Sequence, residues 1–370
     1  MASGIKIALL VLAATGGVGL GLAEGWVGAP AEAATVARSA TLEDLAAKLT
    51  DRFVDPDAGR KYAAMLRTNA NAGKYDSLAD DAAFAKAVTA DLQAVQFDGH
   101  LKLLPPSTEA AANHGGGGDD HLKTPAVQAA ARLTPDVAYI RIGRFFGEPE
   151  AMTAIRKFLT DNADAKTLII DVRTHIGGGL DEMDLMFPMI FDKAQVLVGM
   201  DTRTGVETPI DDGPTLRRAE APPTVVRREH FVTPAAALGN LQKAKIFVLS
   251  SGRTGSAGEH FVLSMKRTHR ATVIGETTYG AGNFGGGVPI VGGFSAWIPV
   301  GRTFDPDTNK GWDYVGVAPN VTVPAAEALT EALVRSGVAR REAEKLSAAH
   351  GPKAADVSSL RKAPASVPGI

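Results

Sequence analysis

The chain has 370 residues, of which 45% are hydrophobic and 22% charged, as in an ordinary globular protein. A formal net charge of −2, without a long basic run, argues against a nucleic-acid-binding surface, which needs a dense basic patch. The absence of cysteine excludes disulfides, thiolate metal ligands, a cysteine nucleophile and a lipid-modified cysteine. The length accommodates one large domain and a smaller one.

Residues 1–34 have the layout of a secretory signal peptide. The segment contains one lysine, Lys6, and an apolar stretch from Ile5 to about Leu22, and Ala31 and Ala33 form an A-x-A cleavage site. The alternative is an uncleaved anchor, because the run is nearly long enough to span a bilayer. The glycines in the run and the "AEAA" that follows it favour cleavage. We therefore expect a bacterial periplasmic or secreted protein, tethered to a membrane only if this segment is retained.

Residues 35–112 predict a helical N-terminal subdomain. In "TLEDLAAKLTDRFV", Thr41 and Asp44 indicate a helix start, and apolar residues follow at helical spacing. "SLADDAAFAKAVTADLQAV" repeats that spacing through Val95. The apolar positions are Leu42, Leu45, Leu49 and Phe53 in the first stretch, and Leu78, Phe84, Val88, Leu92 and Val95 in the second. Residues 113–136 begin with the polar, glycine-rich "NHGGGGDDH" and are predicted to be a linker.

Residues 137–340 alternate strand-like and helix-like segments, which predicts a layered α/β core. "VAYIRI", "TLIIDVR" and "KIFVLS" are typical of buried strands, and Pro149 marks the first turn of a helix. Pro188 is expected to interrupt the helix in "LDEMDLMFPMI". Short strands follow in "ATVIGE", "GGVPIV", "FSAWIPV" and "VTVP", before a closing helix over about 325–334. Residues 341–370 are expected to be a flexible tail.

Ser256 follows the strand "KIFVL" in the stretch "SSGRTGSAGEHF" (250–261). With Glu259 it matches the capping box, in which a serine hydroxyl satisfies a backbone donor at a helix start. A serine on a tight strand-to-helix turn is also a candidate nucleophile, and Gly255, Ala257 and Gly258 leave it accessible. Thr254 departs from the G-x-S-x-G elbow. Both roles are compatible if Glu259 caps the helix and Ser256 faces a cleft.

A second motif, "IIDVRTHIGGGLDEMDL", runs from a strand ending in Asp171 and Arg173 through three glycines into a helix. The spacing does not match the dinucleotide fingerprint, but exposed N–H groups at such a loop suit an oxyanion hole. The N–H of Ala257 and that of Gly177 or Gly178 are the candidates. A plain glycine turn is the alternative reading of this stretch alone.

Histidines supply the candidate bases. His100 lies in "FDGHLKL", His175 lies inside the glycine motif, and His260 is expected to pack on the helix after Ser256. A metal cluster of His114, His121, Asp119 and Asp120 is disfavoured, since these residues lie in a glycine-rich linker. We expect no metal and no cofactor. The Ser-x-x-Lys match at Ser359 and Lys362 is interpreted as accidental, because it falls in the predicted tail.

Together these stretches resemble the C-terminal-processing (tail-specific) serine peptidase family. The segments "DVRTHIGGGL", "TGSAGE", "IGETTYGAG" and "WDYVGVAPNVTV" are similar to four motifs of that family and occur in the family's order, over about 137–333. The resemblance implies a crotonase-like α/β core. The family's peptide-binding insertion domain is not expected, because too few residues separate His100 from Val137.

Positions at which the sequence departs from the family's motifs indicate which branch of the family it resembles. Ala281 occupies the place of the lysine in the Ser–Lys type, so that dyad is excluded there. The sequence is more similar to the branch of tricorn protease and the interphotoreceptor retinoid-binding protein repeats, whose Asp-Gly-His-like segment implies His100 as the base. Asp313 stands where that branch has an acid, usually glutamate. Gly99 replaces a serine of tricorn, and His175 replaces the usual asparagine of the glycine loop.

The resemblance therefore implies an exported serine peptidase that cleaves peptides or protein C-termini. Ser256 would be the nucleophile, His100 the base and Asp313 its orienting acid, with Gly177, Gly178 and Ala257 around the oxyanion. The expected partner is a peptide or unfolded protein, and homo-oligomerisation stays open. Two alternatives remain: a non-catalytic protein of the same fold that carries an apolar ligand, and a serine hydrolase of non-peptide esters or amides.

Overall fold

The computed structural model describes residues 30–106, 124–208, 210–236 and 239–360. Residues 1–29 of the predicted signal peptide lie outside the described residues. So do the four residues of the disfavoured metal cluster, His114, Asp119, Asp120 and His121, and Lys362 in the tail. Within the described ranges, no helix combines the length and the apolar character needed to cross a membrane.

The predicted N-terminal helices are present, and a third helix lies between them. The elements are α1 (Pro30–Arg52), α2 (Pro56–Asn71), α3 (Asp81–Val95) and the short strand β1 (Lys102–Leu104). The predicted helix start at Thr41 is wrong. Thr41 lies inside α1, where its hydroxyl hydrogen-bonds to the carbonyl oxygens of Ala37 and Val291. Val95 is 36% exposed, so it does not belong to the buried face.

A six-stranded sheet forms the centre of the core, in the order β13-β9-β8-β4-β3-β2. Its neighbours run parallel except for the antiparallel edge strand β2. The strands are β2 (Val127–Thr134), β3 (Val137–Ile142), β4 (Thr167–Asp171), β8 (Lys245–Ser250), β9 (Thr272–Gly275) and β13 (Val321–Thr322).

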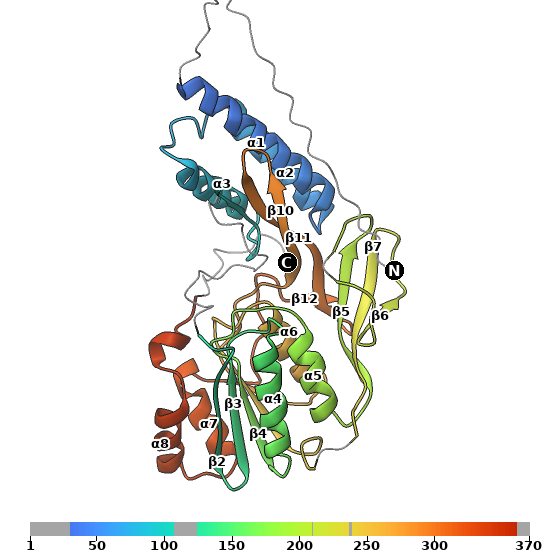
Figure 1. The fold of residues 1–370 in the computed structure, drawn as a ribbon, viewed down its shortest axis with the longest axis vertical. Coiled ribbons are helices and arrows are strands. Elements are labelled where there is room, and N and C mark those ends of the chain that lie inside the picture. The colour runs from blue at the N-terminus through green and yellow to red at the C-terminus, as the bar shows by residue number, and fades with distance from the viewer. Residues whose placement is uncertain (1–29, 107–123, 209, 237–238, 361–370) are drawn as a thin grey trace, which may run out of the picture.

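Helices cover both faces of this sheet, which confirms the α/β prediction (Figure 1). One face carries α4 (Pro149–Asp161), α5 (Asp181–Ile190) and α6 (Ala257–Arg267), whose apolar residues share a cluster with those of β3, β4 and β8. The other face carries η2 (Ala325–Glu327), α7 (Ala328–Arg335) and α8 (Arg340–His350). Strands buried on both faces need continuous apolar sequence, as "LII" (168–170) in β4 and "IFVL" (246–249) in β8 have.

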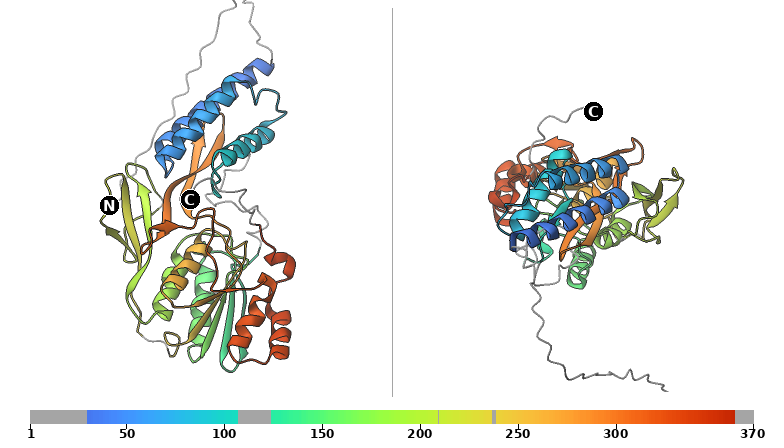
Figure 2. Two further views of the ribbon diagram at one scale, coloured as in Figure 1. Left: turned by 180° about the vertical axis from the view of Figure 1, so that it is seen from behind. Right: turned by 90° about the horizontal axis from the view of Figure 1, so that it is seen from above.

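A second sheet links the core to the N-terminal helices (Figure 2). Its order is β1-β11-β5-β7-β6, and β10 and β12 also pair with β11. The strands are β5 (Gln195–Arg203), β6 (Leu216–Ala219), β7 (Val225–Val232), β10 (Asn283–Ile290), β11 (Phe294–Asp305) and β12 (Lys310–Gly311). Apolar residues of α1–α3 pack against β1 and the first half of β11, which brings the segment after α3 to the core.

Three boundaries differ from the sequence prediction. The predicted linker 113–136 contains β2, an edge strand that pairs with β3. The predicted flexible tail 341–370 instead begins with α8 and η3 (Ala354–Val357), anchored by the buried side chains of Ala343 and Val357. Pro188 does not end its helix, because α5 continues to Ile190.

Candidate active site

Ser256 lies on a sharp turn between β8 and α6. Its φ of 52° and ψ of −118° place a non-glycine residue in a sparsely populated backbone region, which costs roughly 1–3 kcal/mol and persists only where the surroundings hold it. The surroundings do fix it here. The Gly255 N–H donates to the His175 carbonyl oxygen, and the Thr254 hydroxyl donates to that of Val172. The turn that carries Ser256 is thus held against the glycine loop after β4 by hydrogen bonds.

Glu259 caps this turn, as the sequence predicted. Its buried carboxylate accepts hydrogen bonds from the Ser256 N–H at 2.9 Å, the Thr278 hydroxyl at 2.6 Å, and the N–H groups of Gly280 and Ala281 at 2.6 and 2.7 Å. Burial raises the pKa of Glu259 to about 7, against these hydrogen bonds, which lower it. One side chain therefore positions Ser256 and the 278–281 loop together.

His100 and Ser256, 156 residues apart in sequence, meet at hydrogen-bond distance. Nε2 of His100 lies 3.2 Å from Oγ of Ser256. The Trp297 ring of β11 stacks on the imidazole, with 4.6 Å between ring centroids and 22° between planes. Asp98 fixes the backbone here: its carboxylate accepts from the N–H groups of His100 and Leu101 at 2.8 and 3.2 Å. The arrangement can transfer a proton from the serine hydroxyl to the imidazole.

Asp313 lies close to this pair but does not bond to it. Its carboxylate accepts from the Gly282 N–H at 2.9 Å and from the Asn283 amide at 3.3 Å, and that amide also donates to Asp98 at 2.9 Å. Nδ1 of His100 has no hydrogen-bond partner among the described residues. Burial, reinforced by the Asp98 charge, raises the pKa of Asp313 well above its usual value. A direct Asp313–His100 contact is therefore absent, and an orienting role for Asp313 stays a prediction.

The glycine loop lies directly beside Ser256. A Cβ added to Gly177 would come within 3.0 Å of the Ser256 Cβ. The Gly177 N–H donates to Nδ1 of His175 at 3.1 Å, whereas the N–H groups of Gly178 and Ala257 donate to no other part of the described chain. Of the two glycines, Gly178 therefore has the amide available to an oxyanion.

His175 is a structural part of this loop. Burial lowers its pKa to about 3, so it stays neutral and accepts the Gly177 N–H. Phe145 lies edge-on to its ring, and a Cβ on Gly258 would come within 2.7 Å of its Nδ1. Asp171 and Arg173 are likewise structural, because they form a buried ion pair at 2.6 Å.

Gly99 and Ala281, two positions at which the sequence departs from the family's motifs, lie side by side. A Cβ on Gly99 would come within 3.1 Å of both the Ala281 Cβ and the Tyr279 ring. The tricorn-like serine hydroxyl therefore has no room at Gly99 without a shift of its neighbours. His260 lies in a different cluster, where its Nε2 is 2.8 Å from Nδ1 of His230. In the described ranges, no three His, Asp or Glu side chains form a group that could hold a metal ion.

The sequence interpretation missed Asp98, Trp297 and Asn283. The role of Asp98 could have been inferred from the sequence, because an Asp side chain commonly accepts a hydrogen bond from the backbone N–H two residues further along a turn. Trp297 and Asn283 had no such signal, since their contacts with residues 98–100 span more than 180 residues of sequence.

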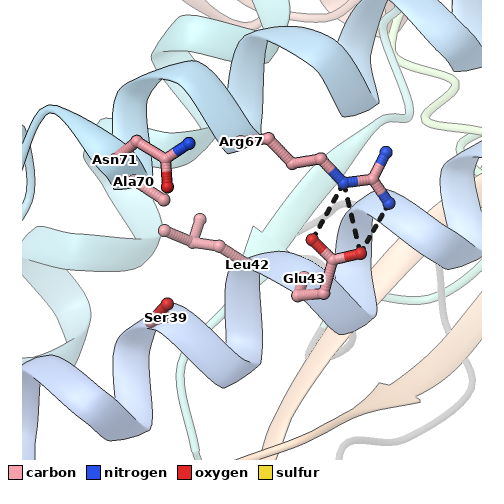
Figure 3. A pocket seen from close by; sticks show the side chains of 6 residues that line it. All are labelled: Ser39, Leu42, Glu43, Arg67, Ala70 and Asn71. Atoms are coloured by element: carbon pink, nitrogen blue, oxygen red, sulfur yellow. Dashed lines mark hydrogen bonds and ion pairs between the residues drawn. The ribbon is translucent and has the colours of Figure 1, made fainter.

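Figure 3 shows a separate pocket between α1 and α2. The exposed Glu43–Arg67 ion pair bridges it, and its lining residues include no paired nucleophile and base.

The pKa of His100 predicts how activity depends on pH. Burial lowers this pKa below 6.5, the Asp98 charge opposes the shift, and the Lys102 charge adds to it. His100 is therefore neutral at pH 7 and able to accept a proton. We expect kcat/KM to rise with pH and to reach half its plateau below pH 6.5. A pH–rate profile of the free enzyme measures this, and a midpoint above 6.5 would contradict it.

The chain matches the family model described as peptidase family S41 over residues 136–323, just over half of its length. The match identifies the protein as a serine peptidase with an α/β core. It belongs to peptidase family S41, which confirms the resemblance to C-terminal-processing peptidases.

Solved structures with this fold include peptidases of that kind. The photosystem II D1 C-terminal processing protease aligns at 15% identity and a TM-score of 0.51, covering 86% of this chain and 98% of its own. A candidate peptidase from Parabacteroides merdae aligns at 15% and 0.55, covering 81% and 96%. Tricorn protease aligns at 13% and 0.50, covering 85% of this chain and 36% of its own. At such identities these matches establish a shared fold.

Proposed function

We propose that this protein is an exported serine peptidase that cleaves peptides or protein C-termini through an acyl-enzyme on Ser256. The observation that carries the proposal is the 3.2 Å contact between Ser256 Oγ and His100 Nε2 on a strained strand-to-helix turn. Export follows from the predicted signal peptide, and N-terminal sequencing of the mature protein tests it. A mature chain that keeps residues 1–34 would contradict cleavage.

In this mechanism, Ser256 Oγ attacks the scissile carbonyl carbon while His100 Nε2 takes the hydroxyl proton. The carbonyl oxygen becomes an oxyanion, which the N–H groups of Ala257 and Gly178 are proposed to bind. Collapse of the intermediate breaks the C–N bond, and His100 returns the proton to the leaving amine. Water then attacks the acyl-enzyme, again with His100 as base, and releases the new carboxylate and free Ser256.

Nε2 of His100 can accept the Ser256 proton only when the ring proton is on Nδ1. Nδ1 lacks a described partner, so stacking on Trp297 and the Asp98-capped backbone supply the orientation that an acid supplies in other triads. The proposed role for Asp313 runs through Asn283 and Asp98. It is a support for the loop rather than a direct partner of His100.

A fluorophosphonate probe tests the nucleophile without knowledge of the substrate. Attack by Ser256 Oγ forms an O–P bond and expels fluoride, and peptide mass mapping locates the adduct. We expect labelling at Ser256 in the wild type, none at that position in Ser256→Ala, and at least tenfold slower labelling in His100→Ala, since a general base contributes typically 10²–10⁴-fold.

Ser264→Ala is the matched control, because it removes a buried hydroxyl from the same helix. It should label like the wild type. Absence of labelling in the folded wild type, together with tight binding of an apolar ligand, would favour the non-catalytic alternative. Labelling combined with turnover of p-nitrophenyl esters, but of no peptide, would favour a non-peptide hydrolase.

A further inference from the structure

Lys102 is a cation close to the candidate base His100, and no anion of the described chain pairs with it. It opens β1, two residues after His100, and its side chain is half-buried. Among the described residues it forms no ion pair and donates no hydrogen bond, and burial is the one influence that lowers its pKa. Lysine side chains of intermediate burial commonly cover apolar surface with the stem and keep the ammonium accessible, and Nζ of Lys102 is not among the fully buried unpartnered atoms, so a ligand can reach it.

The register of the second sheet puts Lys102 on the face that carries His100. Lys102 is directly opposite Trp297 in the antiparallel β1–β11 pair, so the two side chains project from the same face. The Trp297 ring on that face stacks on His100. The Lys102 charge also lowers the pKa of His100, as expected for a cation at short range.

On the other side of Trp297, no described atom covers this face at Gly287. Gly287 of β10 is opposite Trp297, and a Cβ added to it would meet nothing within 4 Å. The row across β10, β11 and β1 therefore runs from an open glycine through an aromatic ring to a cation without an anion partner among the described residues. Its Trp297 and Lys102 end lies next to His100, the proposed base.

The nearby acids are already engaged elsewhere. The Asp98 carboxylate accepts the N–H groups of His100 and Leu101 with one oxygen and the Asn283 amide with the other. Asp313 accepts from Gly282 and Asn283. Neither acid is bonded to Lys102, so within the described residues this ammonium has no anion and is open to one from a ligand.

We propose that Lys102 binds a carboxylate of the peptide substrate, so that the enzyme prefers substrates with an acidic group close to the scissile bond. The carboxylate is either the C-terminal one or that of an aspartate or glutamate side chain. This inference rests on the peptidase activity proposed for Ser256 and His100. It adds a specificity-determining residue that neither takes part in proton transfer nor belongs to the oxyanion hole.

Two peptide libraries test the preference. One is a tryptic digest of a bacterial lysate, and the other is the same digest with every carboxyl group methyl-esterified. We expect the wild type to cleave the acidic library about 10- to 100-fold faster, the range given by one hydrogen bond to a charged group. Lys102→Met should lose that ratio, whereas Lys102→Arg should retain most of it because it keeps the cation.

The ratio of the cleavage rates on the acidic and the esterified library separates recognition of the carboxylate charge from other effects of the substitution. Lys102→Met also raises the pKa of His100, but that change affects both libraries alike. Lys86→Met is the matched control: it removes one exposed charge from α3 and should leave the ratio unchanged. One cleaved peptide is then synthesised in two further forms, one with a C-terminal amide and one with Asp→Asn or Glu→Gln replacements. The form that is cleaved more slowly identifies which carboxylate is bound.

Equal cleavage of both libraries by the wild type would overturn the inference and leave the peptidase proposal intact. So would a Lys102→Met variant that loses activity equally on both libraries. Failure of the folded wild type to cleave either library, with no fluorophosphonate adduct at Ser256, would instead overturn the peptidase proposal and this inference with it.

Discussion

Ser256→Ala and His100→Ala are each expected to lower kcat/KM by about 10⁴- to 10⁶-fold, and the double variant to be no worse than either single variant. The two groups act as one unit, because the hydroxyl is a weak nucleophile until the imidazole 3.2 Å away takes its proton. The activity that remains would come from the oxyanion donors and substrate binding. Kinetics of the four proteins on one cleaved peptide measure the cycle.

Two controls accompany the cycle. Ser264→Ala should keep activity within about twofold, because that hydroxyl has no described partner and lies within α6 rather than at its start. His269→Asn changes an exposed histidine whose φ of 55° asparagine tolerates. A His100→Ala variant within tenfold of wild type would contradict His100 as the base and direct attention to Lys102. Strictly additive losses would contradict a shared proton transfer.

The local parts of this site could be predicted from the sequence, because each follows from a short stretch. Glycines beside a serine at the end of a buried strand predict an exposed hydroxyl on a tight turn, and Ser-x-x-Glu predicts the cap that Glu259 forms. The alternation of apolar strands and helices predicts the core. The contact between His100 and Ser256 did not follow from spacing and entered only through resemblance to a family.

The parts that escaped prediction depend on distant contacts or on weak local patterns. Strands β5, β6 and β7 carry charged residues such as Arg227 and Glu229, so their apolar signal is interrupted. The helix α8 buries chiefly Ala343, too little for a recognisable apolar face. The expectation that Asp313 contacts His100 came from the family resemblance. In this structure the Asp313 carboxylate instead accepts a hydrogen bond from the Asn283 side-chain amide.

Asp171→Asn is expected to destabilise the protein by about 3–5 kcal/mol, because it leaves the buried Arg173 charge without its partner. Both side chains are almost fully buried, at 0% and 1% exposure. The Asp171 carboxylate accepts from Arg173 Nε and Nη2 at 2.9 and 2.6 Å and from the Tyr139 hydroxyl at 2.7 Å. Burial alone would raise the pKa of Asp171, but the Arg173 charge and these hydrogen bonds lower it overall. Urea unfolding of the wild type and the variant gives the difference in free energy.

Matched variants separate the buried charge from a general effect of substitution. Asp164→Asn breaks an ion pair with Arg132 in which Asp164 is 77% exposed, so it should destabilise the protein far less than Asp171→Asn. Asp171→Leu combined with Arg173→Met removes both charges and should be less destabilised than Asp171→Asn, since apolar replacements of buried pairs are often tolerated. It should nevertheless lose activity, because Met cannot replace the hydrogen bond from the Arg173 guanidinium to the Ala325 carbonyl oxygen. The backbone of residue 173, whose carbonyl oxygen accepts the Ser251 hydroxyl close to Ser256, would then be held less firmly. An Asp171→Asn variant within 1 kcal/mol of wild type would mean that water or a backbone shift compensates Arg173, and the ion pair would then not be what holds the glycine loop against Ser256.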